Sequence, residues 1–285
     1  MISRRKLLVG SLAATVLSAA RAAEDPSAAL AELERKHGGR LGVAIFDTGK
    51  DMRIAHRGQE RFAMCSSFKL LAAAFVLARV DRKEESLSRR ITYGKNVLIP
   101  HSPMTERHVG DGMPVGALCE ATMIVSDNAA ANLLLDSFGG PPALTAYLRS
   151  LGDRVTRLDR YETALNDVPP GDPRDTTTPL AMNDTLQKLI LGNALSAPSR
   201  DQLTAWFIAN KTGDKRLRAG VPQGWKVGDK TGTWTEENNA TNDIAVLWPP
   251  GRPPIIVTSY YAHAPGPMEE REAVLAQVGR LAATI

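Results

Sequence analysis

Residues 66–80 read SSFKLLAAAFVLARV and form the strongest predicted helix of this 285-residue chain. Apolar and small side chains fill nearly every position after Lys69, so we expect this helix to pack beside other apolar segments. Helical patterns continue to about residue 207, whereas strand-like alternation occurs near both ends of the chain. The chain therefore combines a helical middle with strand-forming ends.

The predicted sheet is assembled from both ends of the chain. Outside residues 66–80, the predicted helices are 27–37, 115–124, 129–138 (ended by Gly139-Gly140-Pro141), 201–210 and 268–283, and the predicted strands are 41–46, 52–56, 225–227, 243–248 and 255–262. This order favours an α/β (α+β) fold, in which residues 23–60 and 208–285 form an α/β subdomain. Residues 61–207 would form an inserted all-α subdomain, and ligands often bind in the cleft between such lobes.

The positive charge is concentrated at the N-terminus. The net charge is +4, but residues 1–22 hold four basic residues and no acid, so the rest of the chain has 31 basic and 31 acidic residues. A neutral body disfavours a nucleic-acid binder, because no surplus charge remains to neutralise phosphates. We expect no nucleic-acid partner.

Residues 1–22 have the features of an export signal. A basic start precedes an apolar stretch and small residues suited to cleavage near residue 22. The sequence SRRKLL at residues 3–8 resembles a twin-arginine signal, and an ordinary secretory leader is the alternative. We expect a periplasmic protein without a membrane segment once the leader is removed.

A polar, proline-rich segment at residues 158–179 predicts a long loop. Loops of this length inside a compact protein are usually functional or disordered. Arg160 and Asp175 lie near its two ends and could pair to close its neck. Such a pair would leave the loop ordered.

The start of the central helix contains a candidate nucleophile. Ser66 and Lys69 are three residues apart and therefore share one helix face. A lysine among apolar neighbours has a lowered pKa and can accept a serine proton. The alternative role of Ser66 is to cap the helix.

Two further polar triplets have both structural and functional interpretations. Ser126-Asp127-Asn128 precedes a predicted helix and suits capping, or it could supply a proton relay and a substrate-binding amide. Lys230-Thr231-Gly232 follows a predicted strand at a sheet edge, where it could line a cleft. A second copy, residues 211–213, follows a predicted helix, and we interpret it as a helix stop with a glycine cap.

The order Ser-x-x-Lys, Ser-Asp-Asn, Lys-Thr-Gly resembles that of the class A serine β-lactamases. Glu162 to Asn166, ETALN, is similar to the family's omega-loop motif, and Arg160 with Asp175 matches its neck pair. The resemblance covers residues 27–285. It implies a five-stranded antiparallel sheet flanked by terminal helices, with an inserted all-α subdomain.

The resemblance also implies a reaction. Ser66 would attack the lactam carbonyl, activated by Lys69 and by Glu162 through a water, although which base dominates is disputed. Ser126 would pass a proton to the leaving nitrogen with electrostatic help from Lys230. Glu162 would then activate the water that frees the enzyme.

Substrate-binding residues follow from the same resemblance. The backbone N–H groups of Ser66 and Thr233 would form the oxyanion hole. The resemblance implies that Asn128 holds the acylamido carbonyl of the substrate and that Asn166 positions the water. It also implies that Thr231 and Thr233 bind the drug's carboxylate. Arg216 matches an arginine that supports this carboxylate, and His101 matches the residue at the mouth of the cleft.

The sequence departs from the family pattern at several positions. The place of a common supporting arginine is taken by Thr241, so we expect Arg216 to serve instead. The segment at residues 234–240, WTEENNA, is longer than the family's turn. Cys65 and Cys119 each match one half of a different bridge, and their usual partner positions are Trp234 and Ala73. We therefore expect two free thiols.

Two other functions are alternatives to the hydrolysis of β-lactams. A penicillin-binding DD-peptidase or a β-lactam sensor domain shares the fold, but Glu162 argues against both because they lack a deacylating base on such a loop. The histidines show no zinc-ligand spacing, so we expect no metal or cofactor. The expected partner is a small β-lactam, bound by a monomer.

Overall fold

The computed structural model describes residues 25–236 and 238–285. The leader predicted at residues 1–22 lies outside the described residues. Among these residues, none of the helices combines the length and the hydropathy that a membrane span requires.

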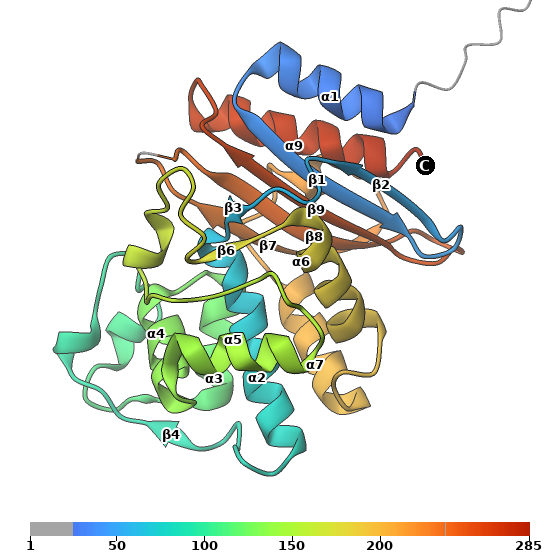
Figure 1. Cartoon of the computed structure of the whole chain (residues 1–285). Helices are drawn as coiled ribbons and strands as arrows, with labels where there is room; N and C mark the ends of the chain where they lie inside the picture. The colour runs from blue at the N-terminus through green and yellow to red at the C-terminus, as the bar shows by residue number, and fades with distance from the viewer. Residues whose placement is uncertain (1–24, 237) are drawn as a thin grey trace, which may run out of the picture.

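The central element is a five-stranded antiparallel sheet with the order β2-β1-β9-β8-β7. Its strands come from both ends of the chain, as predicted (Figure 1). They are β1 (Arg40–Asp47), β2 (Met52–His56), β7 (Lys226–Thr233), β8 (Thr241–Trp248) and β9 (Ile255–Ala262). The fold class expected from the sequence is confirmed.

Helices cover both faces of this sheet. The α-helices are α1 (Pro26–His37), α2 (Phe68–Asp81), α3 (Val115–Ile124), α4 (Asn128–Ser137), α5 (Gly140–Ser150), α6 (Pro179–Leu186), α7 (Ala197–Ile208), α8 (Leu217–Gly220) and α9 (Met268–Ala282). The single-turn helices are η1 (Cys65–Ser67), η2 (Lys95–Val97), η3 (Thr105–His108) and η4 (Ala164–Asn166), and η5 (Gln187–Leu191) is a π-turn. Two small ladders pair β3 (Phe62–Ala63) with β6 (Thr176–Thr177) and β4 (Arg90–Ile91) with β5 (Met113–Pro114).

The alternation of side chains along each strand divides the core into two layers. On β8, Ala245 and Leu247 face the cluster that contains α1 and α9, whereas Ile244 and Val246 face the cluster built on α2. Figure 1 shows α1 and α9 on one side of the sheet and the other long helices on the opposite side. The sheet is therefore buried on both faces.

Helix α2 lies in the centre of the helical side. Nearly all of its residues from Phe68 to Ala78 are buried, including Lys69. The helix is apolar all round because other helices surround it, as its sequence indicated.

Several boundaries differ from the sequence-based expectations. The strand predicted at 225–227 continues to Thr233, because β7 pairs with β8 along its whole length. Helix α7 ends at Ile208, with Ala209 as its C-cap, so residues 211–213 do not form the expected helix stop. Helices α5 and α6 were not predicted.

The loop predicted at residues 158–179 has a closed neck. Arg160 Nε donates to Asp175 Oδ2 at 2.6 Å, and the backbone N–H of Arg160 donates to Asp175 Oδ1 at 2.9 Å. Asp175 is fully buried. The predicted neck pair is confirmed, and we call residues 158–179 the omega loop.

Candidate active site

A cavity of about 360 Å³ lies where η1, the edge strand β7, α4 and the omega loop meet. Most of the predicted site residues line it, together with several that the sequence did not single out. The lining residues are Ser66, Pro100, His101, Ser126, Asn128, Glu162, Thr163, Asn166, Thr212, Arg216, Thr231, Thr233 and Trp234. Lys69 and Lys230 are fully buried beside it.

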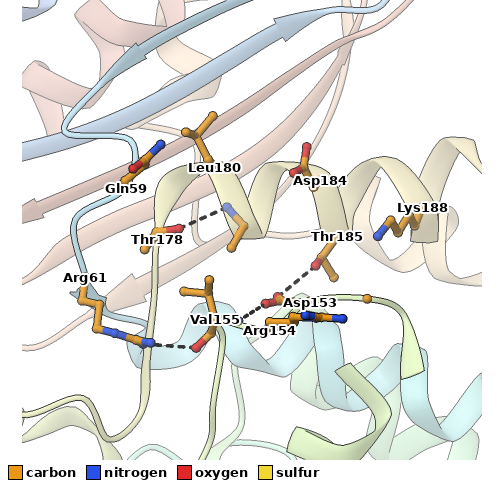
Figure 2. A pocket seen from close by; sticks show the side chains of 12 residues that line it. Gln59, Arg61, Asp153, Arg154, Val155, Thr178, Leu180, Asp184, Thr185 and Lys188 are labelled. Carbon is orange, nitrogen blue, oxygen red and sulfur yellow. Dashed lines mark hydrogen bonds between the residues drawn. The ribbon is translucent and has the colours of Figure 1, made fainter. Parts of the chain in front are cut away.

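A larger cavity of about 520 Å³ lies elsewhere, between α6, the connection from β2 to β3 near Arg61, and residues 152–155, which follow α5. Figure 2 shows Arg61 donating to the Val155 carbonyl and Thr185 bonded to Asp153 at its wall. None of the predicted site residues lines it. The smaller cavity is therefore the candidate active site.

Ser66 and Lys69 meet at one carboxylate oxygen. Ser66 Oγ donates to Glu162 Oε1 at 3.2 Å, and Lys69 Nζ lies 3.1 Å from the same oxygen. The expected contact between Ser66 and Lys69 is thus made through Glu162. Ser66 does not cap α2, since its N-cap is Ser67, whose hydroxyl bonds to Met64.

The ammonium group of Lys69 has three further acceptors. It donates to the Ser126 carbonyl at 2.8 Å, to Ser126 Oγ at 3.2 Å and to Asn128 Oδ1 at 2.5 Å. Burial lowers the pKa of Lys69, and the negative charge of Glu162 opposes this shift. The amine is therefore easier to deprotonate than that of a solvated lysine.

Within the Ser-Asp-Asn triplet, Asp127 stabilises the fold, whereas Ser126 and Asn128 border the cavity. Asp127 caps α4 by accepting from the Ala130 N–H, and it also accepts from the N–H groups of Met104 and Thr105. Its neighbours Ser126 and Asn128 line the cavity. The capping interpretation is confirmed for Asp127, and Ser126 and Asn128 lie where the functional interpretation requires them.

Lys230 and Thr231 lie on the edge strand, facing Ser126. Lys230 Nζ donates to Ser126 Oγ at 3.0 Å. Burial and the nearby charge of Lys69 lower the pKa of Lys230 to about 7, while Asp229 and Asp243 oppose the shift. Ser126 Oγ is therefore bonded to two buried lysines.

Arg216 lies behind the end of the same strand. It is buried, and Nη2 donates to Thr233 Oγ1 at 2.7 Å, while Nη1 donates to the carbonyls of Gly232 and Asn242. Glu272 pairs with its Nε at 3.3 Å. The guanidinium thus places a positive charge next to Thr233.

Glu162 is held on both sides by asparagines. Asn166 Nδ2 donates to Glu162 Oε2 at 2.7 Å. Asn132 binds the backbone of Glu162, accepting from its N–H and donating to its carbonyl, both at 2.9 Å. Asn132 is not among the predicted site residues, although its position one turn after Asn128 on α4 places both on one helix face.

The remaining lining residues form the mouth and floor of the cavity. His101 is exposed, and its Nε2 lies 2.8 Å from the Val125 carbonyl oxygen. Thr212, from the second Lys-Thr-Gly copy, bonds to Thr231 Oγ1. The prediction that only the later copy reaches the cleft was wrong, because the chain after α7 folds back along β7.

Both cysteines are buried and unbridged. Trp234 stands where the family's bridge partner would be, and it packs against a cluster that contains Cys65. Burial raises the pKa of both thiols. Among the described residues, no group of three or more His, Cys, Asp or Glu side chains is arranged to hold a metal.

Comparisons with known proteins identify the family of the chain. The model of the Beta-lactamase enzyme family matches residues 25–284. The chain is 51% identical to Beta-lactamase L2 of Stenotrophomonas maltophilia over 88% of this chain and 83% of the relative, and 50% identical to the Carbapenem-hydrolyzing beta-lactamase KPC of Klebsiella oxytoca over 88% and 86%. The solved structure of an ancestral (GNCA) class A β-lactamase is 62% identical, with a TM-score of 0.89 over 91% of this chain and 99% of that one. This chain therefore belongs to the β-lactamase enzyme family, in its class A branch.

Proposed function

We propose that this enzyme opens the β-lactam ring of penicillins and cephalosporins through an acyl-enzyme on Ser66 and so confers resistance to them. The convergence of Ser66 Oγ and Lys69 Nζ on Glu162 Oε1 carries this proposal. A hydroxyl beside a carboxylate and a lysine of lowered pKa has two neighbouring bases that can take its proton.

Acylation would begin with attack of Ser66 Oγ on the lactam carbonyl. The serine proton passes to Lys69 or, through a water, to Glu162, and the lactam C–N bond then breaks. Ser126 Oγ supplies a proton to the departing nitrogen and is recharged through its bonds to Lys69 and Lys230. The backbone N–H groups of Ser66 and Thr233 would stabilise the oxyanion.

Hydrolysis of the acyl-enzyme would depend on Glu162 and Asn166. The carboxylate accepts a proton from a water that attacks the ester. Asn166 Oδ1 is buried and has no hydrogen-bond partner among the described residues, so it offers an acceptor for that water. Asn132 would hold Glu162 in place from behind.

The drug's carboxylate would bind at the end of β7. Thr231 and Thr233 offer hydroxyls there, and Lys230 and Arg216 supply positive charge. Asn128 would hold the acylamido carbonyl with its side-chain amide, and His101 would border the mouth of the cleft. Although the rest of the chain is nearly neutral in net charge, these positive side chains would create a local electrostatic field that attracts anionic drugs to the cleft.

Replacement of Glu162 tests the proposal. Glu162→Gln keeps the shape of the side chain but removes the base, so hydrolysis of the acyl-enzyme should slow by about 10²- to 10⁴-fold. The wild type should turn over a chromogenic cephalosporin many times, and the variant should accumulate a covalent adduct on Ser66, visible by mass spectrometry. A DD-peptidase or a sensor domain would instead react stoichiometrically in the wild type. Unchanged steady-state turnover in Glu162→Gln would contradict the role of Glu162.

We also propose that the protein works as a periplasmic monomer exported by the twin-arginine route. The leader at residues 1–22 supports export, and its sequence SRRKLL at residues 3–8 supports the twin-arginine route. The division into residues 23–60 with 208–285 and residues 61–207 would place the cleft between two subdomains.

A further inference from the structure

The connection between β7 and β8 contacts the omega loop near the catalytic carboxylate. Figure 1 shows the omega loop at the end of the sheet where β7 leads into β8. Asn238, in this connection, donates from Nδ2 to the backbone carbonyl of Asn166 at 2.9 Å. Both residues are about 4% exposed. The contact is therefore a buried bond between two segments far apart in the sequence.

Asn166, which accepts this bond, also contacts the carboxylate of Glu162 directly. The side chain of Asn166 donates to Glu162 Oε2 at 2.7 Å and to the Thr163 carbonyl at 2.9 Å. Asn238 thus restrains the backbone of the residue whose side chain orients Glu162. Asn238 does not line the cavity that contains Ser66.

The connection itself is fastened to the sheet and to α9. The His263 N–H donates to the Asn238 carbonyl at 2.7 Å, and Asn239 Nδ2 donates to the Ala264 carbonyl at 2.5 Å. Arg271, on α9, donates to the Asn239 carbonyl at 3.2 Å. Asn238 therefore bonds the omega loop to a connection that is itself held in place by the end of the sheet and by α9.

An apolar contact runs beside the hydrogen bond. Trp234 packs against a small cluster of Ala63, Cys65, Val168 and Ala240. Val168 belongs to the omega loop, and Cys65 precedes the nucleophile. The same connection thus joins the omega loop to the segment that carries Ser66.

We infer that Asn238 is a positioning residue for hydrolysis of the acyl-enzyme. The inference rests on the proposed function, since it concerns how Glu162 and Asn166 are held for the second step. Acylation has an alternative base in Lys69, whose contacts do not involve the connection. Loss of the Asn238 bond should therefore slow hydrolysis more than acylation.

The test measures the two steps separately in the full chain. Stopped-flow traces with a chromogenic cephalosporin give the acylation and hydrolysis rates, and mass spectrometry gives the fraction of acylated Ser66. Asn238→Ala should reduce the hydrolysis rate about tenfold, because small displacements of a catalytic group are costly, and should change acylation less than about twofold. Asn238→Asp, of the same shape but without the N–H donor, should behave alike.

Two further variants separate positioning from general loosening. Asn239→Gly removes a neighbouring anchor of the same connection, and glycine tolerates the φ of +40° at this position. Its effect on hydrolysis should be clearly smaller. In an Asn166→Ala background, which lacks the amide that orients Glu162, Asn238→Ala should change hydrolysis less than about twofold, because the two residues act in series.

The outcomes distinguish this inference from the proposed function. A wild type that reacts only stoichiometrically overturns the proposed function. A wild type that turns over, with Asn238→Ala and Asn238→Asp hydrolysing the acyl-enzyme at the wild-type rate, overturns only the role of Asn238. Equal slowing in Asn239→Gly, or additive effects with Asn166→Ala, also overturns it. Asn238→Gln, which retains the amide donor, should recover part of the hydrolysis rate.

Discussion

At the scale of single residues, the side chains of two buried lysines bond to the same serine hydroxyl. Lys69 and Lys230 both donate to Ser126 Oγ, at 3.2 and 3.0 Å. Two like charges this close in a desolvated site destabilise each other, which favours the loss of one proton. The acidic shift of both pKa values thus follows from packing and cannot be calculated from the spacing of residues in the sequence.

A pH profile follows from the lowered pKa of Lys230. Its pKa of about 7 means that the side chain is charged below this pH and neutral above it. For an anionic β-lactam, kcat/KM should therefore decrease as the pH rises. The midpoint of this alkaline limb should lie far below the pKa of a free lysine. Lys230→Arg, whose guanidinium stays charged, should move this limb to higher pH. Lys226→Arg, at the exposed start of β7, should leave the profile unchanged, and an unmoved limb in Lys230→Arg would exclude Lys230 as its origin.

At the scale of elements, a short stretch of glycine and proline can mark both the end of one helix and the start of the next. The sequence Gly139-Gly140-Pro141 predicts the end of a helix, and α4 indeed ends at Ser137. The same glycines and proline also begin α5, because proline is favoured in the first turn of a helix. A stop signal and a start signal overlap there, which is why α5 was missed.

The neck of the omega loop gives a prediction for stability. Arg160→Ala leaves the fully buried carboxylate of Asp175 without its charged partner. The free energy of unfolding should fall by about 2–3 kcal/mol, since an unpaired buried charge is costly. Urea denaturation measures the loss.

A second arginine of the same loop serves as the control. Arg174 pairs with Asp172 at 2.7 Å, and its side chain is 52% exposed. Solvent screens such a pair, so Arg174→Ala should cost less than about 1 kcal/mol. Equal losses in both variants would show that the neck pair does not stabilise the loop specifically.

At the scale of the whole molecule, the site depends on how closely the sheet edge approaches the start of α2. A Cβ at Gly232 would lie 2.7 Å from the Met64 carbonyl oxygen and 3.2 Å from the Ser66 N atom. Only glycine therefore permits this approach. The distance between β7 and the nucleophile is set by backbone contact.

Gly232→Ala should separate β7 from η1. We expect kcat/KM to fall at least about tenfold, because the groups on β7 move away from Ser66. Overpacking should also cost about 1–3 kcal/mol of stability. Steady-state kinetics and urea denaturation measure these effects.

Gly94→Ala is a matched control. Its Cβ would meet only the side chain of Asn96, which can move. Activity and stability should stay near those of the wild type. A Gly232→Ala variant with unchanged kcat/KM would contradict the proposed dependence on close approach.

The sequence alone determined the chemical groups, their order along the chain and the periodicity of most elements. These features depend on local interactions: Ser66 and Lys69 are one helical turn apart, and successive side chains of a strand point to opposite faces of the sheet. The neck pair of Arg160 and Asp175 could also be predicted, because both ends of one loop lie close in the sequence.

Only the tertiary structure decided which groups meet across the cleft. The partners of Asn132, Thr212 and Asn238 could not be predicted from the sequence, since packing brings them together from distant segments. The two Lys-Thr-Gly copies have the same local sequence, and their different places follow from strand pairing and from the fold of the chain after α7. Burial then sets the electrostatics of the site, because the desolvation that lowers the pKa of Lys69 and Lys230 exists only in the folded protein.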